Sequence, residues 1–192
     1  MMKMTKVAAA ALLLSVSAAP VMAQKLSPAV IAIVDMDRIV NESAAGKQAG
    51  TELQTKISGL QSRASNLQTQ LKTDADAIQQ GQANKSLAGA QLEQRARAFQ
   101  EKQQAAQQEL GRLENDVQRS RQYVIQQIDA AAQPIITQVM RERGASIVLA
   151  EGATVQHSAS LDITTDVITR LNTSLPRVST TPPAAPAQQQ QQ

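Results

Sequence analysis

The fold of this chain depends on an eight-residue polar stretch, QQGQANKS (79–86), that separates two series of regularly spaced apolar and small residues. Each series advances by alternating steps of four and three, which is the heptad spacing of coiled-coil helices, except that Asp74 interrupts the last heptad of the first series. The first series comprises Leu53, Ile57, Leu60, Ala64, Leu67, Leu71 and Ile78. The second comprises Leu92, Ala96, Phe99, Gln103, Ala106, Leu110, Leu113, Val117, Ser120 and Val124.

The polar stretch contains glycine and asparagine, which favour turns, so we expect the chain to reverse at 81–86. Two antiparallel helices of roughly 35 residues each would form an arm about 50 Å long at a rise of ~1.5 Å per residue. The alternative is one uninterrupted helix in a parallel rod, with Gly81 tolerated. The seam includes Asp74 and Gln103, and residues 47–143 contain 21 glutamines. This composition predicts a thinly packed, bendable arm.

Short apolar runs flank the helical region. Residues 30–34 (VIAIV) suit a strand covered on both faces, and Asp35 can cap a short helix that follows. Residues 146–150 and 153–157, separated by Glu151-Gly152, predict a β-hairpin.

A final helix is expected after Asp162, its plausible cap, with Ile163, Val167 and Leu171 on one face. A turn near residue 84 would place Lys47 opposite Arg121, so that 122–143, with Pro134 as a kink, overhangs the first helix and docks on the strands.

The sequence therefore predicts an α+β fold, mainly α, with a long antiparallel coiled-coil hairpin projecting from a small β body. Residues 24–46 and 122–175 would form the body, 47–121 the arm, and the Pro- and Gln-rich residues 176–192 a disordered tail. So small a body is marginal alone, and we expect copies to share strands.

The N-terminus has the pattern of a secretory signal peptide over 1–23. Lys3 and Lys6 precede 13 uncharged residues, and Val21-Met22-Ala23 fits the cleavage pattern, so the mature chain would begin at Gln24. An uncleaved anchor or a buried helix is the alternative. The chain has no Cys, and an exported chain without Cys favours a bacterial envelope compartment.

The composition gives little support for an enzyme, a cofactor or a metal site. There is no Cys or Trp and only one His, His157, which reads as a surface residue. Asp35 and Asp37 are better explained by helix capping than by metal binding. Gly46 and Gly50 are not followed by the Gly-Lys-Ser/Thr of a phosphate loop, so we interpret them as permitting close approach to another element.

The charge of the predicted arm is nearly balanced. Residues 47–143 carry 13 basic and 10 acidic side chains, and the mature chain has a formal charge of +1, which argues against nucleic-acid binding. The cations on its outer half are the candidates for contact with a bound chain, although a solvated coiled-coil face also explains them. They are Lys56, Arg63, Lys72, Lys85, Arg95 and Arg97.

Four segments resemble the OmpH-type periplasmic chaperone family, also called the Skp family. They are IAIVDM (31–36), NESAAGK (41–47), RGASIVL (143–149) and DITTDV (162–167), arranged around a Gln-rich helical hairpin. The resemblance covers about 30–171. It implies a homotrimer with a β-barrel-like body formed from strands of all three subunits. Three arms would surround a cavity that holds unfolded outer-membrane proteins in the periplasm.

The expected activity is that of an ATP-independent holdase, since no Walker-type motif is present. Better-known members of the family have strongly basic arms, whereas the charge of this arm is nearly balanced. Contact with anionic lipid is therefore expected to be weak. A structural or adaptor coiled-coil protein of the envelope is the main alternative, and an envelope hydrolase lacks candidate residues. The subunit interface is predicted at the strands, through Ile31, Ile33, Ile147, Leu149 and Val155.

Overall fold

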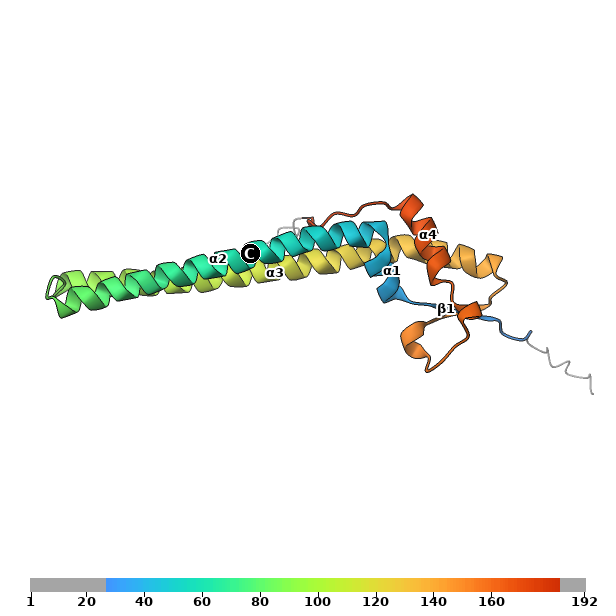
Figure 1. Ribbon diagram of the computed structural model, residues 1–192, viewed down its shortest axis with the longest axis horizontal. Helices are drawn as coiled ribbons and strands as arrows, with labels where there is room; N and C mark the ends of the chain where they lie inside the picture. Colours follow the sequence, from blue (N-terminus) through green and yellow to red (C-terminus); the bar gives the residue numbers. More distant parts are fainter. Residues whose placement is uncertain (1–26, 184–192) are drawn as a thin grey trace, which may run out of the picture.

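The structure, a computed structural model, describes residues 27–183 and is mainly helical with one small strand pair. The predicted signal peptide and its cleavage site lie outside these residues, as do 184–192. Figure 1 shows a long arm projecting from a small body, and this body contains both the first strand and the last helix of the described residues. Within residues 27–183, every helix falls short of the length or the apolar character that a bilayer-spanning segment requires.

The chain enters the body through β1 (Ile31–Val34) and α1 (Met36–Glu42). Asp35 caps α1 as predicted, because its Oδ1 accepts a hydrogen bond from the Arg38 N–H at 2.9 Å. The Asp35 N–H in turn donates to Thr164 Oγ1 at 2.9 Å, which joins the start of α1 to the last helix.

The arm is built from α2 (Ala44–Ala83) and α3 (Ala90–Glu142), which lie side by side (Figure 1). Side-chain contacts join Lys56 to Ser120, Arg63 to Glu109 and Asp74 to Lys102. Residues further along α2 therefore contact residues earlier in α3, so the two helices run in opposite directions. The apolar seam of each helix faces the other, in keeping with the heptad spacing.

The reversal at the tip occupies 84–89, three residues later than the predicted 81–86. Gly81 is still helical, and its carbonyl accepts a hydrogen bond from the Leu87 N–H at 2.9 Å. A Cβ on Gly81 would lie 2.4 Å from Leu87 Cδ1. The glycine thus serves to let Leu87 fold back over the end of α2, and Lys85, with φ of 59°, turns the chain.

The displaced turn also shifts the alignment of the two helices. Because Arg63 pairs with Glu109 and Lys56 with Ser120, counting back along α2 and forward along α3 places Lys47 opposite residues 125–129 rather than Arg121. The overhang of α3 is correspondingly shorter than predicted. Pro134 lies in the overhang, and α3 runs through it to Glu142.

The sheet consists of β1 and β2 (Ile147–Ala150) in parallel, with Ile31 beside Ile147 and Ile33 beside Leu149. The predicted β-hairpin at 146–157 is wrong. Glu151–Ala153 forms a 3₁₀ turn and 154–158 is not a strand. The reason is that β2 pairs with β1, and the chain then leaves the sheet before a second strand could fold back on β2.

The chain returns to the sheet through a second 3₁₀ turn, Ala159–Leu161, and then enters α4 (Thr164–Ser174). Asp162 forms a bridge with Ile33, and the Ile163 N–H donates to the Ile33 carbonyl at 2.9 Å, so the free edge of β1 is filled. Asp162 was the predicted cap of α4, but the cap position is Ile163, one residue later. Asp162 still contacts the first turn, because its Oδ1 accepts a hydrogen bond from the Thr164 N–H at 2.8 Å.

The hydrophobic core lies where the arm meets the body. The predicted apolar face of α4 is buried there, at Ile163, Val167 and Leu171. Most of the other buried residues come from the strands and from the body ends of the helices: Ala32, Val34, Ile39, Ala45, Ala49, Val124, Ile128, Ala132, Ile136 and Val139. Ala145, between α3 and β2, and Val178, after α4, complete the core.

Val178 in this core corrects the prediction of a disordered tail from residue 176 onward. Residues 176–183 are extended and pack on α2 and α3, with Val178 8% and Thr180 5% exposed. Composition alone suggested disorder because the segment is rich in proline, but two of its side chains find places between the helices.

Candidate functional site

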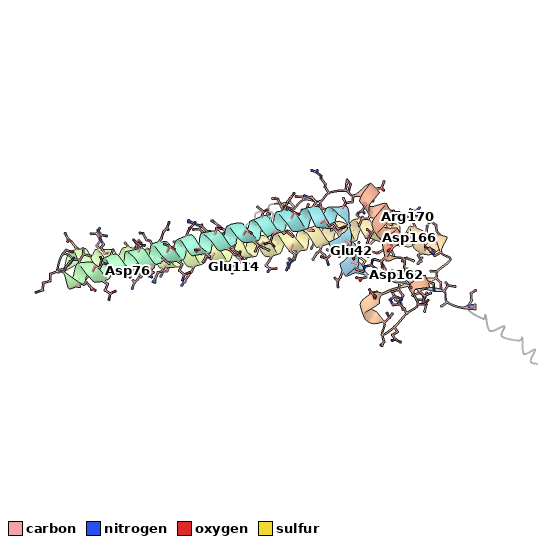
Figure 2. All side chains as sticks on the ribbon, in the orientation of Figure 1. Glu42, Asp76, Glu114, Asp162, Asp166 and Arg170 are labelled. Carbon is pink, nitrogen blue, oxygen red and sulfur yellow. The ribbon has the colours of Figure 1, made fainter. Side chains whose placement is uncertain are left out.

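The candidate functional surface is the outer part of the arm, where packing between the helices is thin. Beyond Ala49 on α2 and before Val124 on α3, most apolar seam residues are only half-buried. The buried exceptions within the described arm are Leu67, Gly81, Ala106 and Ser120. The outer arm thus offers a long, partly apolar surface flanked by glutamine and charged side chains. Figure 2 shows side chains projecting along the whole arm, Asp76 and Glu114 among them.

Two of the predicted client-binding cations hold the arm together. Arg63 donates to both carboxylate oxygens of Glu109, at 2.7 and 2.9 Å, across the two helices. This pair raises the pKa of Arg63 and lowers that of Glu109. Lys56 donates to Ser120 Oγ at 2.9 Å and to the Thr180 carbonyl at 2.8 Å. These two cations are therefore engaged within the chain.

The other four predicted cations are exposed and do not converge on one place. Lys72 lies on α2 and Lys85 in the tip turn. Arg97 makes a long ion pair of 3.5 Å with Glu93 on the same helix. Arg95 lines one hollow near the tip, and Arg97 lines another. The cations are spread along the arm, so they offer many separate contacts and no single charged pocket.

The hollow that Arg95 lines, which we call the tip hollow, has a volume of about 510 Å³. Its apolar lining includes the chain's one phenylalanine, Phe99, and its rim includes Lys102, whose Nζ lies 2.6 Å from Asp74 Oδ2. Sequence reasoning did not single out this site, although Asp74 interrupting an apolar seam was the available signal. The complete lining is Asp74, Ile78, Leu87, Gln91, Gln94, Arg95, Ala98, Phe99 and Lys102.

The predicted interface residues fall into two groups. Ile31 and Ile147 are 37% and 43% exposed and lie beside each other on the sheet, with Leu149 half-buried further along. Val155 is fully exposed, but in a loop rather than a strand. Ile33 is 2% exposed, so its own chain already covers it, and its assignment to an interface surface is corrected.

The histidine, carboxylates and glycines that the sequence offered for catalysis, metal binding or phosphate binding make contacts of a structural kind. Within residues 27–183 no three Asp, Glu, His or Cys side chains gather as a metal site would require. His157 lies 3.3 Å from Glu151 Oε1, and its pKa is raised by its hydrogen bond to the Ser158 carbonyl and by Glu151. Gly46 sits against the Val40 carbonyl, in agreement with the close approach inferred for it, whereas Gly50 faces open space.

Two ion pairs join α4 to the C-terminal end of α3, Arg143 with Asp166 and Arg170 with Glu142. Figure 2 labels Asp166 and Arg170 on α4. Arg170 Nη1 and Nη2 donate to Glu142 Oε1 and Oε2 at 2.9 and 2.5 Å. Together with a bond from Gln138, this lowers the pKa of Glu142 from 4.5 to about 2. The pair lies on the surface, so it tunes the attachment of α4 rather than driving it.

The stability that this pair supplies depends on pH in a defined direction. Because the pKa of Glu142 is lower in the folded chain, the contribution is present above about pH 4.5 and is lost as the pH falls through about 2. We expect the urea midpoint of Arg170→Met to lie below that of the wild type near neutral pH, with the difference closing in acid. Arg121→Met, at an exposed arginine without an ion pair among residues 27–183, is the control. A difference that is independent of pH would contradict the assignment.

The order of these elements, with strand motifs on either side of a helical arm, is that of a known family. Residues 30–171 match the family of outer membrane proteins described as OmpH-like. The chain belongs to the OmpH-like family. The match begins just before β1 and ends within α4, so it covers the arm and nearly all of the body of this OmpH-like chain and stops before 176–183.

A solved structure shares this fold. It is a crystal structure from Caulobacter crescentus CB15, described as an outer membrane chaperone of the OmpH-like kind, with a TM-score of 0.70 and 24% sequence identity. The alignment covers 81% of this chain and 90% of that one. None of the curated protein sequences is significantly similar to this OmpH-like chain.

Proposed function

We propose that this OmpH-like chain is a periplasmic holdase chaperone, which binds unfolded outer-membrane proteins and keeps them from aggregating without using ATP. The observation that carries the proposal is the outer arm, a long surface of half-buried apolar side chains with glutamines and scattered cations. Its membership of the OmpH-like family supports a chaperone role.

The binding mechanism follows from the arm's chemistry. Each half-buried leucine or isoleucine offers a little apolar surface, and each free cation or amide offers one polar contact. Such contacts are individually weak, but they add when they act together on one chain, because each bound segment raises the effective concentration of the next. The client needs no fixed shape, and it can leave stepwise.

The body supports assembly into the proposed homotrimer. Val30, Ile31 and Ile147 expose apolar side chains beside one another at the start of the sheet. Within the described chain the sheet has only two strands, and the outer edge of β2 carries no partner strand. Open strand edges and exposed apolar groups are commonly covered by another chain. Three copies joined here would hold three arms around a shared space.

The direct test is suppression of client aggregation. A urea-unfolded outer-membrane β-barrel protein is diluted into buffer with increasing amounts of the chain, and light scattering is recorded. We expect suppression to saturate near one trimer per client and to be unaffected by ATP. Absence of suppression at any excess would contradict the holdase proposal. Capture of one folded helical partner instead would favour an adaptor.

The tip hollow provides a variant for the same assay. Phe99→Ala removes the one aromatic ring from the hollow, and we expect the concentration for half-suppression to rise roughly threefold, because one of many additive contacts is lost. Gln100→Ala, at the exposed neighbouring position, is the matched control.

A further inference from the structure

The segment that follows α4 is bound along the base of the arm as an extended peptide. We call residues 176–183 the strap. Within it, Val178 and Thr180 are buried whereas Ser179 and Thr181 are exposed. This alternation is that of an extended chain with one face against a surface. In Figure 1 the strap runs from α4 back over α2 toward the tip.

The groove that receives the strap is lined by both helices of the arm. Gln48, Glu52 and Lys56 are spaced by four residues, so they lie along one face of α2. Gln127 reaches the strap from α3. Lys56 is fixed from the other side by Ser120 Oγ, at 2.9 Å, so its ammonium group is positioned for the strap by α3.

Four of the five hydrogen bonds between groove and strap go to main-chain atoms of the strap. The Val178 N–H donates to Gln48 Oε1 at 3.3 Å, and Lys56 Nζ donates to the Thr180 carbonyl at 2.8 Å. The Gln127 amide pairs with both groups of Ser179, accepting from its N–H at 3.1 Å and donating to its carbonyl at 2.9 Å. Only Thr180 Oγ1, which donates to Glu52 Oε2 at 2.7 Å, is recognised as a side chain.

Recognition of this kind depends little on sequence. Main-chain N–H and carbonyl groups are present in nearly every residue, and a side-chain amide that pairs with both groups of one residue acts like a neighbouring strand. The remaining requirements are one apolar side chain in the place of Val178 and a small hydroxyl residue two positions later. The groove is therefore built for an extended segment of rather general sequence.

We propose that this groove is a binding site for extended segments of unfolded polypeptides, and that the strap occupies it as a competitor within the same chain. The proposal deepens the holdase function above and names a site for it at the base of the arm. The strap keeps the apolar place of Val178 covered when no client is present. A bound client segment takes its place, and the strap then helps to drive the client out.

The first test uses a dye-labelled synthetic peptide with the strap sequence LPRVSTTPP (175–183), titrated against full-length variants and followed by anisotropy. In Val178→Asp a carboxylate would have to be buried among apolar groups, so the strap leaves the groove. The peptide is expected to bind this variant about tenfold more tightly than the wild type, because a strap bound nine-tenths of the time lowers the apparent affinity by that factor.

Two variants make this result specific. Thr181→Asp places the same charge at an exposed strap position and should leave the peptide affinity at the wild-type value. Adding Gln127→Ala to Val178→Asp should abolish the gain, since the main-chain pairing is lost. Circular dichroism confirms that each variant keeps its helices. Equal peptide affinity for wild type and a folded Val178→Asp would overturn the proposal.

The second test leaves the strap sequence nearly intact. The chain has no cysteine, so Thr181→Cys accepts a single nitroxide label on the strap, and Thr173→Cys accepts one on α4. Addition of an unfolded outer-membrane protein should mobilise the label at 181 and leave the label at 173 unchanged. A client that binds without mobilising residue 181 overturns the strap proposal. A client that does not bind contradicts the holdase function, and the peptide titration then decides about the groove separately.

Discussion

Replacing Gly46 by alanine is expected to destabilise the folded chain by about 3 kcal/mol or more. A Cβ at this position would lie 1.6 Å from the carbonyl oxygen of Val40 and 2.8 Å from its carbonyl carbon. These are backbone atoms of α1, which cannot rotate away as a side chain could. The Gly46 N–H also donates to Ser43 Oγ at 3.1 Å, so the start of α2 cannot shift without losing its cap.

Gly50→Ala is the matched control, one helical turn further along α2. Nothing lies within 4 Å of a Cβ placed there, and the residue is exposed. Alanine should therefore raise stability by about 0.5–1 kcal/mol through its better helix propensity. Urea unfolding followed by circular dichroism measures both variants. Similar small effects at the two positions would show that α1 does not press on α2 at Gly46.

Ile147→Asp is expected to reduce the solution mass from three chains to one. In the proposed trimer the exposed side chains of Ile31 and Ile147 are covered by a neighbouring copy, and a carboxylate buried there without a partner charge would be strongly unfavourable. In the single chain the same position is 43% exposed, so the subunit itself should tolerate the aspartate. Light scattering after size exclusion gives the mass.

The control for assembly is Ile125→Asp, the same change at an α3 isoleucine of similar exposure, 38%. It should leave the mass unchanged, because it lies on α3 and not on a strand. An Ile147→Asp chain that stays folded and keeps the wild-type mass would contradict an interface at the start of the sheet. Loss of mass in both variants would mean that assembly depends on the arm rather than on the strands.

The elements that the sequence predicted well are those defined by neighbouring residues. The heptad spacing on either side of 79–86 indicated two long helices, and the spacing of Ile163, Val167 and Leu171 indicated the buried face of α4. The capping role of Asp35 also rests on contacts within four positions. Membership of the OmpH-like family was recognisable from the strand and turn motifs at 31–47 and 143–167.

The errors arose where distant segments compete for the same place. Residues 153–157 looked like the second strand of a hairpin, but β2 pairs with β1, which precedes it by more than 100 residues. Residues 176–183 were predicted to be disordered from their proline-rich composition. Their binding place on α2 and α3 exists only in the folded chain, so composition could not indicate it. Arg63 and Lys56 read as free surface cations, yet their partners Glu109 and Thr180 are apparent only after the chain has reversed.

The parallel pairing of Ile31 with Ile147 also sets an order of events for a chain that is synthesised from its N-terminus. β1 is complete long before β2 exists, and 116 positions separate the two. Bringing β1 and β2 together across so long an unfolded segment would be slow. If α2 and α3 pair first, starting from the tip, they bring the two strands close, and the further loss of chain entropy on pairing the strands is small. The first strand must wait, unpaired, until the arm has formed.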